Sequence, residues 1–249
     1  MSMGVRSYVC VSRNLCDVLL VSFPAGPLQA NCYFVSRGPG TGCAIVDPGM
    51  DSLDGIEKVV KEHNLLPAAV LITHGHFDHM WCASDVARLY DTPVWIHPND
   101  RHLLADPMAA ISNESSAMLR QQLGMTDIPD FTEPADVRDA VDGAEIEVDG
   151  LTFTVDHVPG HTPGTVAYRV DYDGPENVSQ LMFSGDFLFA GSIGRTDLNG
   201  GSHPDMCSSL ASKVLPLADD IIVLPGHGAQ TSIGRERSSN PFLQEPIGG

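Results

Sequence analysis

The sequence predicts an α+β protein in which helices cover two packed β-sheets. Strand-like runs occur in groups in both halves of the chain, and amphipathic segments lie between these groups and after them. Elements that are apolar on one face pack into layers, and sheets covered by helices are one of the few stable layered arrangements. The 249 residues are enough for one domain with a sizeable core, although two small domains would also fit.

The first half of the domain reads as strands with two helices between them. One predicted helix starts near Asp51, a plausible N-cap, and carries apolar residues at helical spacing. The stretch RGPGTG is a turn between two of the strands. The predicted strands are 17–23, 31–36, 43–49, 68–73 and 93–97, and the predicted helices are 51–66 and 78–90.

The second half opens with an insertion and continues with further strands. Residues 98–142 form this insertion, in which 99–123 looks helical and 128–143 looks like a loop. Asp149 and Gly150 then make a hairpin turn between two alternating runs. The predicted strands of this half are 144–148, 151–158, 165–172, 179–189 and 220–228, with a helix at 204–215 and a short polar tail. We expect 17–249 to be a single domain and 1–16 to be an N-terminal extension that need not be ordered.

Composition and charge narrow the class of function. The formal net charge is −18, from 14 Lys and Arg against 32 Asp and Glu, so the field of the protein repels polyanions and a nucleic-acid partner is not expected. No apolar run approaches the roughly 18 residues of a membrane span, and no secretory signal is evident. The six cysteines are scattered without a CxxC pair, which favours reduced thiols and a cytoplasmic location.

The stretch THGHFDHM, residues 73–80, places three histidines and an aspartate directly after an apolar strand. On an extended tip alternate side chains share one side, so His74 and His76 can converge on one metal ion. Asp78 and His79 stand where the chain turns into a helix and would point elsewhere. Histidine and carboxylate are natural ligands of zinc and related ions. The spacing therefore favours two ions over one.

Three further ligand candidates stand beside glycine, each where an apolar strand stops. They are His161 in VPGHTPGT, Asp186 in FSGDFLF and His227 in LPGHG. Glycine lets the backbone bend tightly and approach an ion. Any one of these stretches alone is a turn, but several such turns that each carry a ligand are hard to explain by packing.

These residues, with Asp47 in IVDPG, resemble the metallo-β-lactamase superfamily, whose signature is HxHxDH followed by distant His, Asp and His. The resemblance implies a four-layer αββα sandwich with the metals at one edge of the sheets. It implies that Asp186 bridges two ions and, with Asp78, is catalytic, while Asp47 orients ligands. The implied ligand sets are His74, His76 and His161 for one ion, and Asp78, His79 and His227 for the other. β-Lactamases of the superfamily often carry cysteine in place of Asp186, which disfavours an antibiotic substrate.

Within the superfamily the stretches GSIGRTD, LPGHG and GRERSSNPFL are similar to short-form type II glyoxalases, the hydroxyacylglutathione hydrolases. The similarity implies hydrolysis of a thioester such as S-lactoylglutathione or another acyl-thiol. Two divalent ions, expected to be zinc with iron or manganese as alternatives, would activate water and polarise the carbonyl. Few residues follow His227, so the glutathione-binding domain of long-form relatives is not expected.

Two rival functions use the same residues. Lactonases of the superfamily share the ligand set on a chain of similar length. Persulfide dioxygenases of the same fold keep a single iron, which here would be held by His74, His161 and Asp186.

His157, Arg195 and the insertion at 98–142 stand outside the predicted set of ligands. We expect His157 to be a buried, hydrogen-bonded core residue near the metals, with a catalytic role as the alternative. We expect Arg195 to brace its loop by an ion pair with Asp197, with contact to the substrate as the alternative. The insertion is a candidate specificity segment, and packing onto the sandwich is the alternative for its apolar side chains. Those side chains are Leu103, Leu104, Met108, Met118, Leu119 and Leu123.

Overall fold

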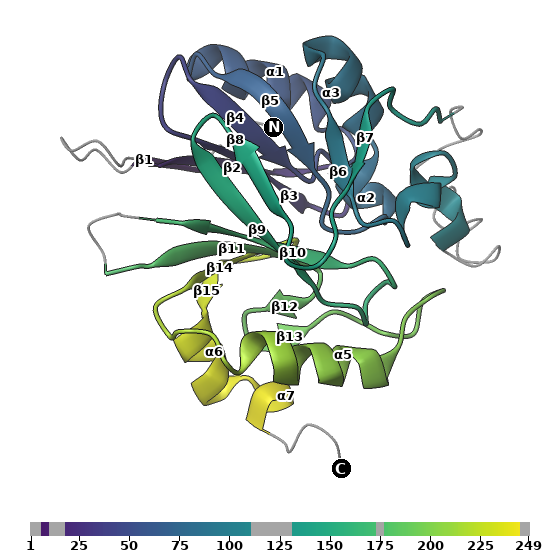
Figure 1. The fold of residues 1–249 in the computed structure, drawn as a ribbon, viewed down its shortest axis with the longest axis vertical. Coiled ribbons are helices and arrows are strands. Elements are labelled where there is room, and N and C mark those ends of the chain that lie inside the picture. Colours follow the sequence, from purple (N-terminus) through teal and green to yellow (C-terminus); the bar gives the residue numbers. More distant parts are fainter. Residues whose placement is uncertain (1–5, 10–17, 111–130, 173–176, 245–249) are drawn as a thin grey trace.

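A computed structural model describes residues 6–9, 18–110, 131–172 and 177–244 (Figure 1). Its first sheet has seven strands that follow one another in sequence order from β1 to β7. The strands β1 to β4 pair antiparallel, and β4 to β7 pair parallel. The strands are β1 (Arg6–Val9), β2 (Leu19–Ala25), β3 (Ala30–Ser36), β4 (Gly42–Val46), β5 (Leu66–Leu71), β6 (Val94–Ile96) and β7 (Val137–Asp139).

The second sheet has six strands in the order β15-β14-β11-β10-β9-β8. Only β11 and β14 pair parallel within it, and a separate two-stranded hairpin, β12 and β13, follows β11 in the chain. The strands are β8 (Glu145–Val148), β9 (Leu151–His157), β10 (Val166–Asp171), β11 (Gln180–Gly185), β12 (Leu188–Phe189), β13 (Ser192–Ile193), β14 (Ile222–Pro225) and β15 (Thr231–Ser232).

Helices cover the outer face of each sheet (Figure 1). The helices α1 and α3 lie on the first sheet, and α5 to α7 lie on the second, while α2 and two 3₁₀ turns stand at the edge. The bounds are α1 (Leu53–Glu62), α2 (Phe77–Met80), α3 (Ala83–Tyr90), η1 (Arg101–Leu104), η2 (Pro107–Ala110), α5 (His203–Ser209), the π-helical η3 (Leu210–Val214), α6 (Ile233–Ser239) and α7 (Pro241–Gln244).

Three separate apolar cores establish the four layers. Along β3, Cys32 and Phe34 face the core under α1 and α3, whereas Tyr33 and Val35 face the core between the two sheets. This alternation is what a strand buried on both faces requires. A third core, which includes Met182, lies between the second sheet and the C-terminal helices. The predicted αββα sandwich is confirmed.

Several predicted elements differ in the structure. The helix predicted over 78–90 is two helices, α2 and α3, because the chain turns at Cys82, whose amide donates to the carbonyl of Pro48 at 2.9 Å. The loop predicted over 128–143 contains β7, which extends the first sheet by pairing with β6. The described part of the tail, which the sequence predicts only to be short and polar, contains β15, α6 and α7.

The insertion is described only in part. Over the described half of the helix predicted at 99–123, the structure has two short 3₁₀ turns, η1 and η2, and Pro107 starts the second because it cannot donate to the turn before it. Leu104 packs in the core under α3, which favours the packing role for this residue. Met118, Leu119 and Leu123 lie outside the described residues. Of the N-terminal extension, residues 6–9 form β1, and the remainder also lies outside.

Candidate metal centre

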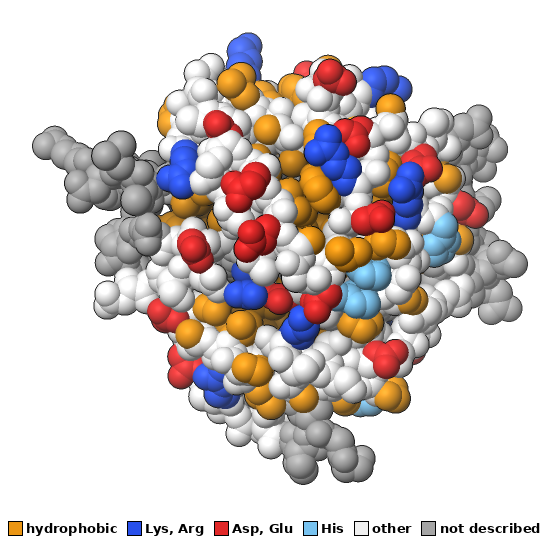
Figure 2. Space-filling model, viewed as in Figure 1, with side chains coloured by type: hydrophobic (Ala, Val, Ile, Leu, Met, Phe, Trp, Pro, Cys, Tyr) orange, Lys and Arg blue, Asp and Glu red, His pale blue; other side chains and the backbone are white. Residues whose placement is uncertain are grey.

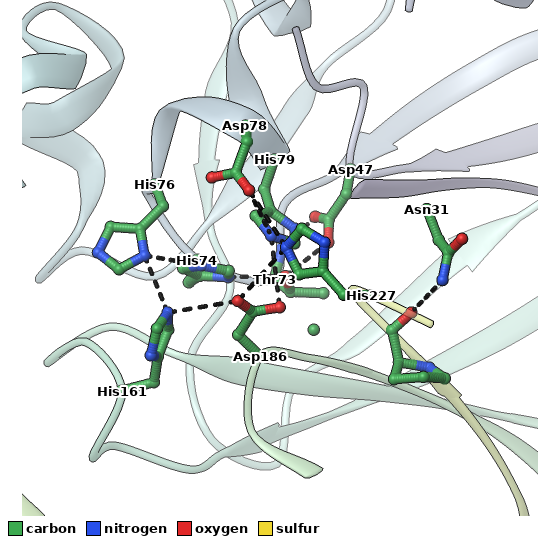
Figure 3. Close-up of polar contacts among 12 residues, drawn as sticks. Asn31, Asp47, Thr73, His74, His76, Asp78, His79, His161, Asp186 and His227 are labelled. Atoms are coloured by element: carbon green, nitrogen blue, oxygen red, sulfur yellow. Dashed lines mark hydrogen bonds and ion pairs between the residues drawn. The ribbon is translucent and has the colours of Figure 1, made fainter. Parts of the chain in front are cut away.

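The seven predicted ligands converge at one edge of the sandwich, between the two sheets (Figure 3). His74 follows β5, and His76, Asp78 and His79 stand at or on α2, so four ligands come from the first sheet. The second sheet supplies the other three from the ends of β9, β11 and β14. These three are His161, Asp186 and His227.

His74, His76 and His161 form a three-histidine group. The Nδ1 atom of His76 lies 3.2 Å from His74 Nε2 and 2.9 Å from His161 Nε2. All three side chains are buried. Burial, with the neighbouring His161, lowers the pKa of His76 to about 3, and burial also lowers the pKa of His74 and of His161. The three rings are therefore neutral at pH 7 and present their lone pairs to one point.

Asp78, His79 and His227 form a second group, the Asp78 group. Asp78 Oδ2 lies 3.2 Å from His227 Nε2 and 3.6 Å from His79 Nε2. Burial alone would favour the neutral carboxyl, but the two imidazoles outweigh it and hold the pKa of Asp78 well below its ordinary value. Asp78 is therefore an anion beside two nitrogen donors.

The Asp186 carboxylate lies between the two groups. Its Oδ2 atom is 3.6 Å from His161 Nε2 in the first group and 3.6 Å from His227 Nε2 in the second. Its Oδ1 atom is 3.4 Å from His79 Nε2. The preceding Gly185 has φ +50°, a left-handed conformation that turns the chain at the end of β11. One carboxylate can thus serve both groups.

The donor atoms fit divalent metal ions. A tetrahedral site with ligand distances of ~2.0–2.2 Å has donor atoms roughly 3.3–3.6 Å apart, close to the spacing found here. His79 Nε2 and Asp186 Oδ1 are buried, yet within the described part of the chain neither makes a hydrogen bond. Buried polar atoms without partners are costly unless an ion satisfies them. The cluster is therefore complete as a set of metal ligands and incomplete as a hydrogen-bonded network.

The other ring nitrogens of three histidines are held by the protein. Asp47 Oδ2 accepts from His79 Nδ1 at 2.9 Å, as the family resemblance implies for an orienting residue. Thr73 Oγ1 lies 3.1 Å from His74 Nδ1, and the carbonyl of Arg195 accepts from His161 Nδ1 at 2.8 Å. Such contacts fix the tautomer and the ring orientation of a ligand.

Comparison with known proteins agrees with this geometry. The model of the metallo-beta-lactamase superfamily matches residues 25–227. The chain belongs to this superfamily. Probable metallo-hydrolase YqgX of Bacillus subtilis is 39% identical over 88% of this chain and 95% of its own length. Hydroxyacylglutathione hydrolase GloC of Haemophilus influenzae is 34% identical over the same shares, 88% and 95%.

Solved structures of the metallo-beta-lactamase fold are also similar. The BLEG-1 B3 metallo-beta-lactamase has a TM-score of 0.74 and 36% identity, covering 90% of this chain and 98% of its own. TTHA1623 in a di-iron-bound form has a TM-score of 0.68 and 35% identity, covering 88% and 98%. ETHE1 from Myxococcus xanthus, at 23% identity and a TM-score of 0.69 over 92% and 86%, shares the fold. Among the described helices of this chain, none has the length and apolarity to cross a membrane.

This superfamily member uses a glycine to bring β14 against the cluster. A Cβ atom on Gly226 would lie 2.3 Å from Asp186 Oδ1 and 2.6 Å from His79 Cε1. Any residue larger than glycine at position 226 would displace the Asp186 carboxylate and the His79 ring. Gly226, the first glycine of LPGHG, is therefore required because β14 approaches the cluster closely, as the sequence predicts for glycines beside the candidate ligands.

Glu236 is a supporting residue that the sequence did not reveal. Its buried carboxylate, on α6, accepts from the amide of Gly191 at 2.7 Å and from Asn240 Nδ2 at 2.9 Å. Asn240 also donates to the carbonyl of Ser192 at 3.0 Å. Through Glu236, the helix α6 thereby holds the turn that leads to Arg195, whose carbonyl accepts from His161.

Two other predicted residues have structural roles. Arg195 makes two hydrogen bonds of 2.7 Å to Asp197, which confirms the bracing ion pair. His157 donates from Nε2 to the carbonyl of Pro163 at 2.9 Å and stacks on His97 with ring centroids 3.9 Å apart. It is hydrogen-bonded as predicted, but it is only half-buried because it stands at the rim where β9 ends.

We expect metal uptake by the Asp78 group to strengthen as the pH rises. In the metal-free protein, burial opposes the charged imidazole, but Asp78, Asp186 and Asp47 raise the pKa of His79 to about 10. A metal must displace this proton below that pH, so its affinity should rise about tenfold per pH unit for each proton released. Calorimetric titrations at pH 8 in buffers of different ionisation enthalpy count the protons. Binding without proton release would contradict the prediction.

Proposed function

We propose that the protein is a hydrolase that uses two divalent metal ions and acts on thioesters of small acyl-thiols, in the manner of a hydroxyacylglutathione hydrolase. The observation that carries the proposal is the position of Asp186 between two complete groups of donor atoms. Similarity to the hydrolase GloC supports the substrate class.

The assignment of ligands follows the two groups. His74, His76 and His161 would hold one ion and Asp78, His79 and His227 the other, with Asp186 shared. Zinc suits these donors, and iron and manganese accept them too, as the di-iron form of TTHA1623 illustrates for a relative. When bound, two such ions supply Lewis-acid polarisation of a carbonyl and lower the pKa of a water molecule toward ~7.

The residues of the chain contribute charge and position to the reaction. We assign catalytic roles to Asp78 and Asp186 because their carboxylates would offset the charge of the ions next to the reacting atoms. The buried histidines exclude bulk water from one side of the site, which strengthens every charge interaction there. A thiolate leaving group has a conjugate-acid pKa of about 8.5, so it departs without a dedicated general acid.

Charge and cysteine usage support the rest of the proposal: a small-molecule partner rather than a nucleic acid or a membrane, and a cytoplasmic location. On the face drawn in Figure 2, Lys and Arg side chains are scattered among acidic ones. Cys32, Cys43, Cys82 and Cys207 are free thiols, in accord with a reducing compartment.

The test pairs metal analysis with a substrate panel. We expect about two ions per chain and a higher kcat/KM for acyl-thiol esters than for lactones. A preference for lactones would make the protein a lactonase on the same site. One iron per chain with oxygen uptake on a persulfide would replace the hydrolase with a dioxygenase. A β-lactam belongs in the panel because BLEG-1 is 36% identical.

A further inference from the structure

Asp100 is a fully buried carboxylate that none of the metal groups contains. It lies in the turn between β6 and η1. Its Oδ1 atom accepts from the amide of Gly164 at 2.8 Å. Its Oδ2 atom accepts from the amide of Gly75 at 2.9 Å and from Thr162 Oγ1 at 2.6 Å. Three donors from two distant segments thus satisfy one buried charge.

The hydrogen bonds of Asp100 show that its side chain does not cap the helix η1. Asp100 occupies the N-cap position of η1, where an aspartate side chain normally accepts from the first turn of its own helix. Here the side chain makes no such bond. The carboxylate instead turns away from η1 toward the loops that carry the histidines.

The partners of Asp100 are the chain neighbours of all three members of the three-histidine group. Gly75 lies between His74 and His76, and Thr162 follows His161. Both glycine partners permit the close approach. A Cβ atom on Gly164 would lie 2.5 Å from Asp100 Oδ1, and one on Gly75 would lie 3.2 Å from Asp100 Cβ.

We propose that Asp100 is a positioning residue for one of the two metal ions: it links the segment after β5 that carries His74 and His76 to the loop that carries His161, and so sets the spacing of these three residues. The inference rests on the proposed metal-binding function. Among the hydrogen bonds and ion pairs of the described residues, none joins Asp100 to the Asp78 group, whose His79 is held by Asp47 instead. The two ions should therefore depend on different buried aspartates.

The first test is Asp100→Asn. The amide keeps the shape of the side chain, but its NH₂ group cannot accept, so whichever way it is oriented at least one amide, of Gly75 or of Gly164, loses its acceptor. We expect zinc affinity at the three-histidine group to fall roughly 10–100-fold, the range typical of orienting residues, while affinity at the Asp78 group is unchanged. Equilibrium dialysis against chelator-buffered zinc measures both. Asp139→Asn, an exposed acid on β7, is the matched control.

Double variants separate positioning from general destabilisation. We expect the His76→Ala variant to lack the ion of the three-histidine group, so adding Asp100→Asn to it should cost no further zinc. In a His227→Ala background it should weaken the ion that remains. Equal losses in both backgrounds, or a lowered Tm of the metal-free protein with unchanged zinc affinity, would overturn the inference. Failure of the wild type to bind zinc, iron or manganese would instead remove the proposed function.

Thr162 provides a milder pair of variants should Asp100→Asn not fold. Thr162→Val removes the hydroxyl that donates to Asp100 and keeps the branched shape, whereas Thr162→Ser keeps the hydroxyl. We expect the first to weaken zinc binding at the three-histidine group and the second to restore it. With cobalt in place of zinc, the change should appear in the absorption of one ion alone. Identical zinc affinity in both variants would contradict the proposed role of the Thr162–Asp100 hydrogen bond in positioning the three histidines.

Discussion

Asp186→Asn should lower kcat/KM for thioester hydrolysis by about 10²–10⁴-fold and leave the protein folded. The substitution keeps the volume of the side chain and removes its negative charge. Two dications ~3.5–4 Å apart repel one another, and a shared carboxylate is what offsets that repulsion. The Asp186 oxygens lie 3.4–3.6 Å from His79, His161 and His227. Among the described residues, no other carboxylate forms ion pairs with histidines of both groups.

The measurement is steady-state kinetics together with metal content and circular dichroism. Asp85→Asn, the same change at an exposed acid on α3, is the control and should behave as the wild type. Near-normal turnover of Asp186→Asn with two ions still bound would refute the shared role of this carboxylate.

His76→Ala and His227→Ala should each remove one ion, and a different one. His76 Nδ1 lies within 3.2 Å of the other two nitrogens of the three-histidine group, and His227 Nε2 lies 3.2 Å from Asp78 Oδ2 in the second group. Loss of one of three such donors typically leaves too weak a site to retain an ion at micromolar concentration. Each variant should therefore bind about one ion per chain.

Metal content after dialysis decides the matter, and His203→Ala, at an exposed histidine on α5 that belongs to neither group, serves as the control. Cobalt spectra of the two variants should differ, because the remaining ion has a different set of ligands in each. Loss of both ions from both variants would show that the two groups cannot be filled separately.

The clustering of the seven candidate ligands could be predicted from the sequence because their signal is local. His74, His76, Asp78 and His79 fall within six positions after one strand, and the distant ligands each stand beside glycine. The four layers could also be predicted, since strand runs and amphipathic helices alternate at readable periods. Asp47, which the family resemblance marked as an orienting residue, does contact His79.

Asp100 could not be predicted because its three partners are distant in the sequence and two of them are backbone amides. Glu236 could not be predicted because the segment that it holds, at Gly191, is distant in the sequence and contributes only a backbone amide. A buried carboxylate that accepts from Gly75 and Gly164 looks like any polar residue in a turn until the chain is folded. The strand β7 was missed for a different reason. Its three residues lie at the edge of the sheet and are half-buried or exposed, so they lack the apolar run that marks an inner strand.

The placement of the ligands means that each ion would act as a cross-link between the halves of the molecule. The three-histidine group draws two ligands from the first sheet and one from the second, and the Asp78 group does the same. A ligand that binds only the folded state at 100 times its Kd stabilises that state by about 2.7 kcal/mol. Metal supply would therefore govern how firmly the two sheets are joined at this edge. A metal-free chain would be degraded by proteases sooner than an inactive variant that still binds both ions.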